Sequence, residues 1–304
     1  LGCLPSSGLL TSPLPALNDE EGIALPLGLP PVIDAHVHLF PGPLFEALWA
    51  WFDRHGWPVR YRFPAEEVLA FLLARGVERV VGLMYAHRPG LARGMNRWMS
   101  ALAAAEPRLI GLGTVLPGEP DAAAILDEAF AAGLRGAKLH CHVQCFAVDD
   151  PSMEPLYDVA ERWDRPLLIH AGREPKSPAY ACDPHTICGA DRVERVLSNR
   201  PKLRLCVPHL GADEFAAYER LLLRHDGLWL DTTMMLADYF DVPRQHRLLR
   251  VRPGRVLFGT DFPNIPYAWD REVHHLLEHD LPPDELSLLL GGAAEALYDP
   301  EPGP

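Results

Sequence analysis

The stretch Val32-Ile-Asp-Ala-His-Val-His38 decides the fold of this chain. Its apolar residues predict a short buried strand that carries two histidines at its end. Side chains alternate between the two faces of a strand, so Asp34, His36 and His38 should share one face, with the apolar residues on the other. Two imidazoles about 7 Å apart on one face can converge on a single cation. A lone His-x-His pair fits two hydrogen-bonded histidines equally well, so other strands must supply further ligands.

Strand-like and helical runs alternate from this stretch to the C-terminus. The predicted strands are short, apolar and bounded by Gly or Pro, as is typical of a parallel sheet buried on both faces; they cover residues 32–38, 79–84, 109–115, 134–140, 166–170, 203–209, 228–232 and 255–261. Helices are predicted at 65–75, 90–105, 121–132, 152–163, 189–199, 213–225 and within 237–250. Eight such units favour an α/β fold of the (β/α)8 TIM barrel type. A doubly wound open sheet is the alternative, but it would not bring the first strand beside the eighth.

Two segments lie outside this repeat. Residues 1–31 are rich in Pro, Gly, Ser and Leu and predict an N-terminal arm, which leaves residues 32–304 as one barrel domain. An aromatic insertion follows the first strand at 39–63, with helical spacing from Pro43 to His55. We interpret the insertion as packing at the barrel mouth or between subunits, or as a lid over the substrate.

Composition limits the partners of the chain. Its 304 residues are 48% hydrophobic and 23% charged, which suits a globular protein with a large core. The net charge of −13 argues against nucleic acid or an anionic membrane as partner. No apolar run approaches the roughly 20 residues of a membrane span. We therefore expect a small-molecule substrate, and subunit contacts through the arm or the insertion could make a homo-oligomer.

The six cysteines do not form the framework of a disulfide-rich domain. Free thiols, and a start without the cationic residues of a secretory signal, lead us to expect a cytoplasmic protein. The segment Cys141-His-Val-Gln-Cys145 is similar to a zinc knuckle. It has no second ligand pair at the spacing of a structural zinc site, so we expect no such site there.

Polar side chains end most of the predicted strands, and the C-terminal ends of the strands form the active site of a TIM barrel. Each of these residues alone has an ordinary structural explanation; Asp261, for example, could cap the turn that follows it. Together they place several nitrogen and oxygen ligands at one end of one barrel, as in a catalytic divalent-metal site. The strand ends carry His36, His38, Lys138, His140, His170, His209, Asp231 and Asp261.

Four motifs in this order resemble the amidohydrolase superfamily: Asp-Ala-His36-Val-His38, Leu-Ile-His170, Val-Pro-His209-Leu-Gly and Phe-Gly-Thr-Asp261-Phe-Pro. The similarity covers roughly residues 32–298 and is greatest to the branch of aminocarboxymuconate-semialdehyde decarboxylase. The resemblance implies a divalent metal held by His36, His38, His170 and Asp261. It also implies that His209 acts beside the metal, with Asp261 as a second proton carrier.

Zinc is the ion most often found in the superfamily, and manganese or iron accept the same ligand types. The resemblance leaves the role of Lys138 open. A carboxylated lysine at this place bridges two metals in some branches, whereas a free lysine could bind a substrate carboxylate in a one-metal enzyme. Pairing with an acidic neighbour is the structural explanation. His140 should face the same cavity, and Arg173, in the loop after the fifth predicted strand, could hold an anionic group of the substrate or remain a solvated loop charge.

We therefore expect a metal-dependent hydrolase that attacks the carbonyl of a small amide, lactone or ester with a metal-activated water. Non-oxidative decarboxylation of a small aromatic or muconate-like acid on the same site is the alternative. A barrel without catalysis that only binds or supports other molecules is a third interpretation, which the full set of ligands disfavours.

Overall fold

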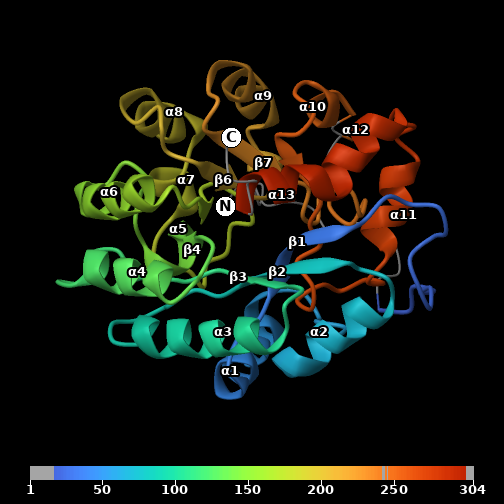
Figure 1. The fold of residues 1–304 in the computed structure, drawn as a ribbon, viewed down its shortest axis with the longest axis horizontal. Helices are drawn as coiled ribbons and strands as arrows, with labels where there is room; N and C mark the ends of the chain where they lie inside the picture. The colour runs from blue at the N-terminus through green and yellow to red at the C-terminus, as the bar shows by residue number, and fades with distance from the viewer. Residues whose placement is uncertain (1–16, 242–243, 245, 299–304) are drawn as a thin grey trace, which may run out of the picture.

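The computed structural model describes residues 17–241, 244 and 246–298, and within them eight parallel strands form a barrel surrounded by helices (Figure 1). The predicted fold class is confirmed. The strands are β1 Ile33–His38, β2 Arg79–Leu83, β3 Leu109–Gly111, β4 Ala137–His140, β5 Leu167–His170, β6 Leu205–Val207, β7 Leu228–Asp231 and β8 Val256–Leu257.

Helices connect the strands and pack around them. The longer ones are α1 Gly42–His55, α2 Ala65–Ala74, α3 Ala92–Ala105, α4 Ala122–Ala131, α6 Glu154–Trp163, α8 Ala190–Asn199 and α9 Phe215–Arg224. The shorter helices and turns are α5 Cys141–Gln144, η1 Pro151–Met153, α7 Pro184–Ile187, η2 His209–Gly211, α10 His246–Arg250, α11 Arg271–Leu277, α12 Pro283–Ser287, η3 Leu288–Gly292 and α13 Ala293–Tyr298.

Backbone hydrogen bonds cross both gaps between the two sheets, which have the orders β1-β2-β3 and β4-β5-β6-β7-β8. On one side, the Lys138 amide donates to the Gly113 carbonyl over 2.8 Å. On the other, the Ala35 amide donates to Phe258 and the Asp261 amide to His36, both over 2.9 Å. The first strand therefore lies beside the last, as a closed barrel requires.

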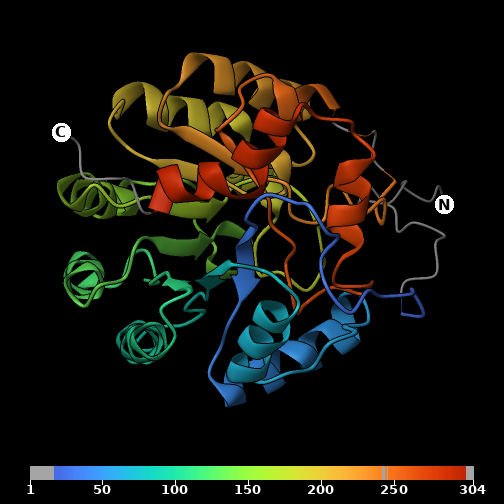
Figure 2. The same ribbon diagram turned by 45° about the vertical axis from the view of Figure 1, so that its right-hand side comes forward.

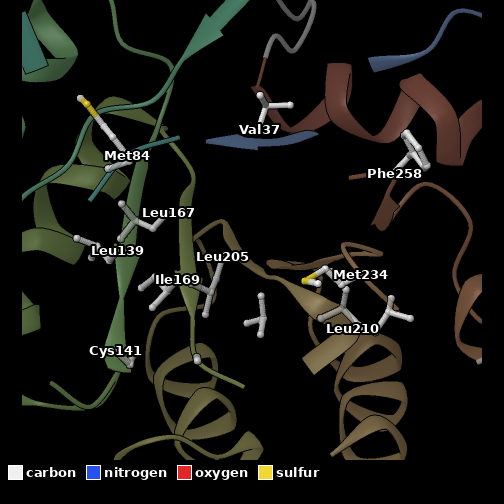
Figure 3. Close-up of a cluster of buried hydrophobic side chains, with 14 of the residues drawn as sticks. Val37, Met84, Leu139, Cys141, Leu167, Ile169, Leu205, Leu210, Met234 and Phe258 are labelled. Atoms are coloured by element: carbon white, nitrogen blue, oxygen red, sulfur yellow. The ribbon is translucent and has the colours of Figure 1, made fainter. Parts of the chain in front are cut away.

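Two buried layers hold the barrel together. The outer layer lies between strands and helices, and Figure 3 shows part of it, with Leu139, Leu167, Ile169 and Leu205 from neighbouring strands. The inner cluster joins strand residues such as Leu168 with side chains of α13, which lies across one end of the barrel (Figure 1). That end is the N-terminal end of the strands, so the opposite end remains for the active site.

The strict alternation predicted for β1 is wrong at one point. The register between β1 and β2 shifts between Asp34 and Val37. As a result, Ile33 packs in the inner cluster, whereas Val37 packs in the outer layer. Asp34 does not line the cavity that contains His36 and His38, because its carboxylate binds the Thr260 hydroxyl across the gap between β1 and β8. A local irregularity of this kind resets which residues share a face.

Two smaller expectations also differ from the structure. The helix predicted at 121–132 begins one residue later, at Ala122, because Asp121 makes no capping hydrogen bond and its side chain pairs with Arg93. The expected helix within 237–250 is shorter, since residues 237–241 are not helical and α10 begins at His246. Residues 242–243 and 245 lie outside the described residues.

The described part of the predicted arm, residues 17–31, packs along the barrel beside α11 (Figure 2). Asp19 forms an ion pair with Arg271 over 2.8 Å, and the Gly22 amide donates to Asp270 over the same distance. The rest of the arm, residues 1–16, lies outside the described residues. The division into an arm at 1–31 and one barrel domain at 32–304 stays a prediction. In the described residues, no helix combines the length and apolar character needed to cross a membrane.

Candidate active site

Three predicted ligands meet at the C-terminal end of the barrel. Asp261 Oδ1 lies 3.0 Å from His38 Nε2 and 3.3 Å from His36 Nε2. One ligand atom from each of these residues lies within 4.8 Å of the others, and all three residues are buried. Two imidazole nitrogens and a carboxylate oxygen at this spacing suit a divalent cation. The structure thus brings His36, His38 and Asp261 together as predicted.

Asp231, at the end of β7, orients His36. Its Oδ2 accepts a 2.7 Å hydrogen bond from His36 Nδ1, so the ring presents Nε2 with a free lone pair to Asp261 and the cavity. Burial lowers the pKa of His36 to about 4, even though the Asp231 carboxylate favours the charged ring. A neutral imidazole is the form that binds a metal. Asp231 therefore holds His36 in a form that can bind a metal.

Asp261 occupies a backbone conformation that few non-glycine residues adopt. Its φ is 71°, and its amide donates to the His36 carbonyl across the gap between β1 and β8. Such a conformation persists where its surroundings over-determine it, and it is common at functional sites. Burial raises the pKa of Asp261, but the neighbouring rings of His38 and His36 outweigh burial and hold the pKa well below its usual range. The carboxylate is ionised and can serve as a ligand.

His170 and His209 lie beside this group but not inside it. The centre of the His209 ring is 5.7 Å from that of His36 and 4.6 Å from that of His170. Each ring has one nitrogen engaged by a backbone carbonyl: His170 Nε2 with Glu174 and His209 Nδ1 with Thr233. This leaves His170 Nδ1 and His209 Nε2 for other partners. The metal-binding role of His170 and the proton-carrying role of His209 stay predictions.

Lys138 and His140, at the end of β4, both line the cavity next to these histidines. Lys138 is fully buried, and its Nζ has no hydrogen-bond partner in the described structure. Burial lowers the pKa of Lys138 to about 8. His140 stacks on His170, with ring centres 4.3 Å apart. A buried ammonium without a partner costs free energy unless a ligand pairs with it, so Lys138 is suited to contact substrate or a modifying group.

The cavity above these residues has a volume of about 540 Å³, which is large enough for a small organic molecule. The predicted insertion forms part of it, because Leu44, Leu48 and Trp51 of α1 line the wall. Seven aromatic side chains contribute to the lining, namely Phe40, Trp51, Phe52, Trp57, Tyr85, Tyr180 and Phe240. Tyr180 stacks on Trp51 with ring centres 5.6 Å apart, so the insertion meets the loop after β5 at the mouth.

Arg173 is not brought to this site. It does not line the cavity, and its guanidinium pairs instead with Asp213 over 2.8 Å and Glu214 over 3.5 Å. Of the two interpretations of Arg173, the loop charge fits these contacts, and a role in holding an anionic substrate stays a prediction. A loop arginine next to two consecutive carboxylates forms ion pairs with them at the surface.

Sequence reasoning also missed participants. Asp231 ended a predicted strand but received no role, although it contacts both His36 and the His209 amide. His142 lines the cavity and is fully buried, with its Nε2 2.8 Å from the Gly172 carbonyl. The only signal for His142 in the sequence was its place two residues after His140, inside the segment considered as a zinc knuckle.

Comparison of the sequence with models of protein families finds a match: the family model for amidohydrolases matches residues 33–299. This chain belongs to the amidohydrolase family. The predicted superfamily is confirmed, and the protein is an amidohydrolase-family enzyme. Among curated proteins, none matches the sequence.

Solved structures of amidohydrolase-like enzymes share the fold at low identity. A 5-carboxyvanillate decarboxylase from Novosphingobium aromaticivorans, complexed with manganese and 4-hydroxy-3-methoxy-5-nitrobenzoic acid, has a TM-score of 0.70 at 17% identity over 91% of this chain and 98% of that chain. The 5-carboxyvanillate decarboxylase of Sphingomonas paucimobilis has a TM-score of 0.63 at 20% identity over 88% and 98%. A probable 2-pyrone-4,6-dicarboxylic acid hydrolase from Acinetobacter baumannii, with citric acid bound, has a TM-score of 0.60 at 14% identity over 88% and 98%.

The residues of this chain fit the divalent metal that the family implies. His36, His38 and Asp261 offer two imidazoles and an ionised carboxylate at ligand spacing. The identity of the ion is not fixed by these ligands.

Proposed function

We propose that this enzyme removes the carboxyl group of a small hydroxylated aromatic acid as carbon dioxide, without oxidation, at a divalent-metal site. One observation carries the proposal: the candidate metal ligands His36, His38 and Asp261 and the unpaired Lys138 line one cavity together with seven aromatic side chains. The sequence alone favoured hydrolysis. The aromatic lining and the similarity to two decarboxylases of aromatic acids now make decarboxylation the first candidate.

The proposed metal ligands are His36, His38, His170 and Asp261. His170 would use Nδ1, because its Nε2 is engaged by the Glu174 carbonyl. A bound divalent ion supplies positive charge that polarises substrate oxygens. Asp231 holds His36 in the ligand tautomer, and Lys138 would bind the carboxylate or a phenolic oxygen of the substrate.

The protein must also exclude water and deliver one proton. When the carbon–carbon bond breaks, its electron pair remains on the ring carbon, and a proton must take the place of carbon dioxide. His209 Nε2 is the proposed proton carrier, since Thr233 fixes the opposite nitrogen of the ring. The aromatic wall, including the Trp51–Tyr180 stack, would cover the substrate ring and keep the site dry.

The test is carbon dioxide release from a panel of hydroxybenzoates, including 5-carboxyvanillate, by the protein loaded with zinc or manganese. We expect release with at least one substrate and none with Asp261→Ala, which removes both a proposed ligand and a proton carrier. Arg173→Gln should retain activity, because Arg173 does not line the cavity. Hydrolysis of a lactone or amide without any carbon dioxide release would reject the proposal.

Hydrolysis remains the second candidate, and Lys138 is the observation that favours it. A carboxylated Lys138 would place a further anionic ligand beside His36 and Asp261 and allow a second ion. Elemental analysis separates the two cases: about one ion per chain fits a free Lys138 and decarboxylation, and about two fit a bridging Lys138 and hydrolysis. Loss of the second ion in Lys138→Met would confirm the bridge.

A further inference from the structure

Four of the five described cysteines lie close together in the segments that follow β4 and β5. Cys141 begins α5, and Cys145 follows its end. Cys182 and Cys188 lie in the long segment 171–189, which connects β5 to α8 and supplies Lys176, Ser177 and Tyr180 to the cavity. The loop therefore adds two thiols, Cys182 and Cys188, to the two of the segment 141–145.

The four thiols form two pairs that differ in access to solvent. Cys145 is exposed and Cys182 is partly exposed, whereas Cys141 and Cys188 are buried. The Cys182 thiol lies 3.3 Å from the His142 carbonyl oxygen, and the Cys145 thiol lies 3.8 Å from the same atom. The Cys145 and Cys182 side chains also hydrogen-bond to one another. The two accessible thiols thus contact the same carbonyl oxygen.

We propose that Cys145 and Cys182 are a thiol–disulfide exchange site that a low-molecular-weight disulfide oxidises to an intramolecular disulfide. In the first step, one cysteine attacks the oxidant, forms a mixed disulfide and releases one small thiol. In the second, the other cysteine attacks the mixed disulfide and displaces the second small thiol. The two cysteines lose two electrons and two protons, and one oxidant molecule becomes two thiols.

The structure also assigns the order of the two steps. Cys145 is the more exposed thiol, so it meets the oxidant first. Burial and the hydrogen bond to Cys145 raise the pKa of Cys182 to about 12, which keeps Cys182 protonated and unreactive at the start. Once Cys145 carries the mixed disulfide, Cys182 is the neighbouring thiol that can displace the second small thiol, which makes it the resolving cysteine.

The buried pair, Cys141 and Cys188, is the main competitor for the oxidant. A hydrogen bond from Cys141 lowers the pKa of Cys188 to about 6, so Cys188 has more thiolate character than Cys141 or Cys182, whose pKa values are raised. However, only 5% of its surface is exposed, and Cys141 is completely covered. Reaction with a soluble oxidant requires access as well as ionisation. Access therefore favours Cys145 over Cys188.

Oxidation would restrain the mouth of the cavity. Tyr180 is two residues before Cys182 and packs on both His142 and Trp51, with ring centres 5.3 Å and 5.6 Å away. A disulfide to Cys145 would join this loop to α5, directly after the strand that carries Lys138 and His140. The loop over the cavity would then move less freely than in the dithiol form.

The test treats the Cys3→Ser protein with oxidised glutathione, alkylates the remaining thiols after unfolding, and maps the peptides by mass spectrometry. The Cys3 substitution removes the thiol that lies outside the described residues. We expect a disulfide between the peptides of Cys145 and Cys182, with the buried cysteines alkylated. A Cys141–Cys188 disulfide, a stable mixed disulfide, or five unreacted thiols would each overturn the proposal.

Variants test the order of reaction without any catalytic assay. Cys182→Ser should accumulate glutathione on Cys145, whereas Cys145→Ser should stay almost unmodified. Cys206→Ser, in the barrel core, is the matched control and should still form the disulfide. Oxidation should raise the melting temperature by about 5 °C in the control and not in either single variant. Equal modification of both single variants, or no shift in the control, would contradict the assignment.

Discussion

Asp231 connects two histidines of the site through different atoms. One carboxylate oxygen accepts from the His36 ring and the other from the His209 amide, which belongs to a residue with a φ of 56°. The carboxylate therefore fixes a ring orientation and a turn at the same time. Outer partners of this kind change metal affinity although they never contact the metal.

We expect Asp231→Asn to weaken metal binding by about 10–100-fold, because an amide does not hold His36 in the ligand tautomer as a carboxylate does. Metal titration of the stripped protein measures this affinity. Asp213→Asn, at an exposed ion pair outside the cavity lining, is the control and should bind metal as the parent does. Unchanged affinity in Asp231→Asn would show that His36 is oriented by other contacts.

Gly259 allows His36 to occupy its place. A Cβ added there would lie 2.7 Å from the Thr233 hydroxyl and 2.8 Å from the His36 Cβ, so Thr233, His36 or the backbone of residue 259 would have to move. We predict that Gly259→Ala displaces His36 and lowers metal affinity at least tenfold, in line with other changes that misplace a ligand. Gly94→Ala is the control, since nothing lies within 4 Å of the added atom. A normal metal affinity in Gly259→Ala would show that the backbone yields instead.

Single residues show where sequence reasoning succeeds and where it stops. His36, His38 and Asp261 were predictable because motif and strand position fix both residue type and location. Arg173 was not, because its neighbours Asp213 and Glu214 come from another loop. The role of Asp231 was hidden for the same reason: the sequence shows a carboxylate at a strand end but not the ring that it faces.

At the scale of elements, one buried carboxyl group of α11 binds the loop after β7. Glu272 is fully covered, accepts a 2.8 Å hydrogen bond from the Tyr267 hydroxyl and accepts another from the Leu236 amide. Burial raises the pKa of Glu272 well above its usual range. The folded protein therefore keeps a proton that the unfolded chain releases at a lower pH.

This proton makes stability depend on pH. Because the folded pKa is raised, the contribution of Glu272 is complete below the unfolded pKa of about 4.3 and is lost as the pH rises towards the folded value. Glu272→Gln should remove this loss, which reaches about 1.4 kcal/mol per pH unit, while the exposed Glu67→Gln should not. Urea unfolding from pH 5 to pH 8 measures the slopes. Parallel slopes in all three proteins would mean that Glu272 is ionised when folded.

Element boundaries were predicted best where Gly or Pro marks them. Helix α2 ends just before Gly76, as expected, whereas the register shift inside β1 left no signal in the sequence. The shift depends on how β1 meets β2, which is a tertiary contact. Helix α10 is shorter than predicted for the same kind of reason, since helical spacing alone does not show whether a segment finds a partner.

At the scale of the whole molecule, the described arm joins distant parts of the chain. Arg271 is 8% exposed and pairs with Asp19, and Asp19 also accepts from the Ala268 amide. Asp19→Asn leaves a buried guanidinium with less compensation, so we expect a loss of about 2 kcal/mol in the free energy of unfolding. Asp121→Asn, at an exposed pair, should cause little change. Equal denaturation midpoints for both variants would show that the arm does not stabilise the barrel.

The gap between β1 and β8 gives the proposed metal a second consequence. His36 and His38 lie on one side of this gap and Asp261 on the other, so an ion held by all three would link the first strand of the barrel to the last. A ligand bound only by the folded state adds about 4 kcal/mol of stability at 1,000 times its dissociation constant. Chelation should therefore speed hydrogen exchange at the Ala35 and Asp261 amides more than at Leu168, within the continuous sheet. Loss of the ion would then open the ring of strands as well as stop the chemistry.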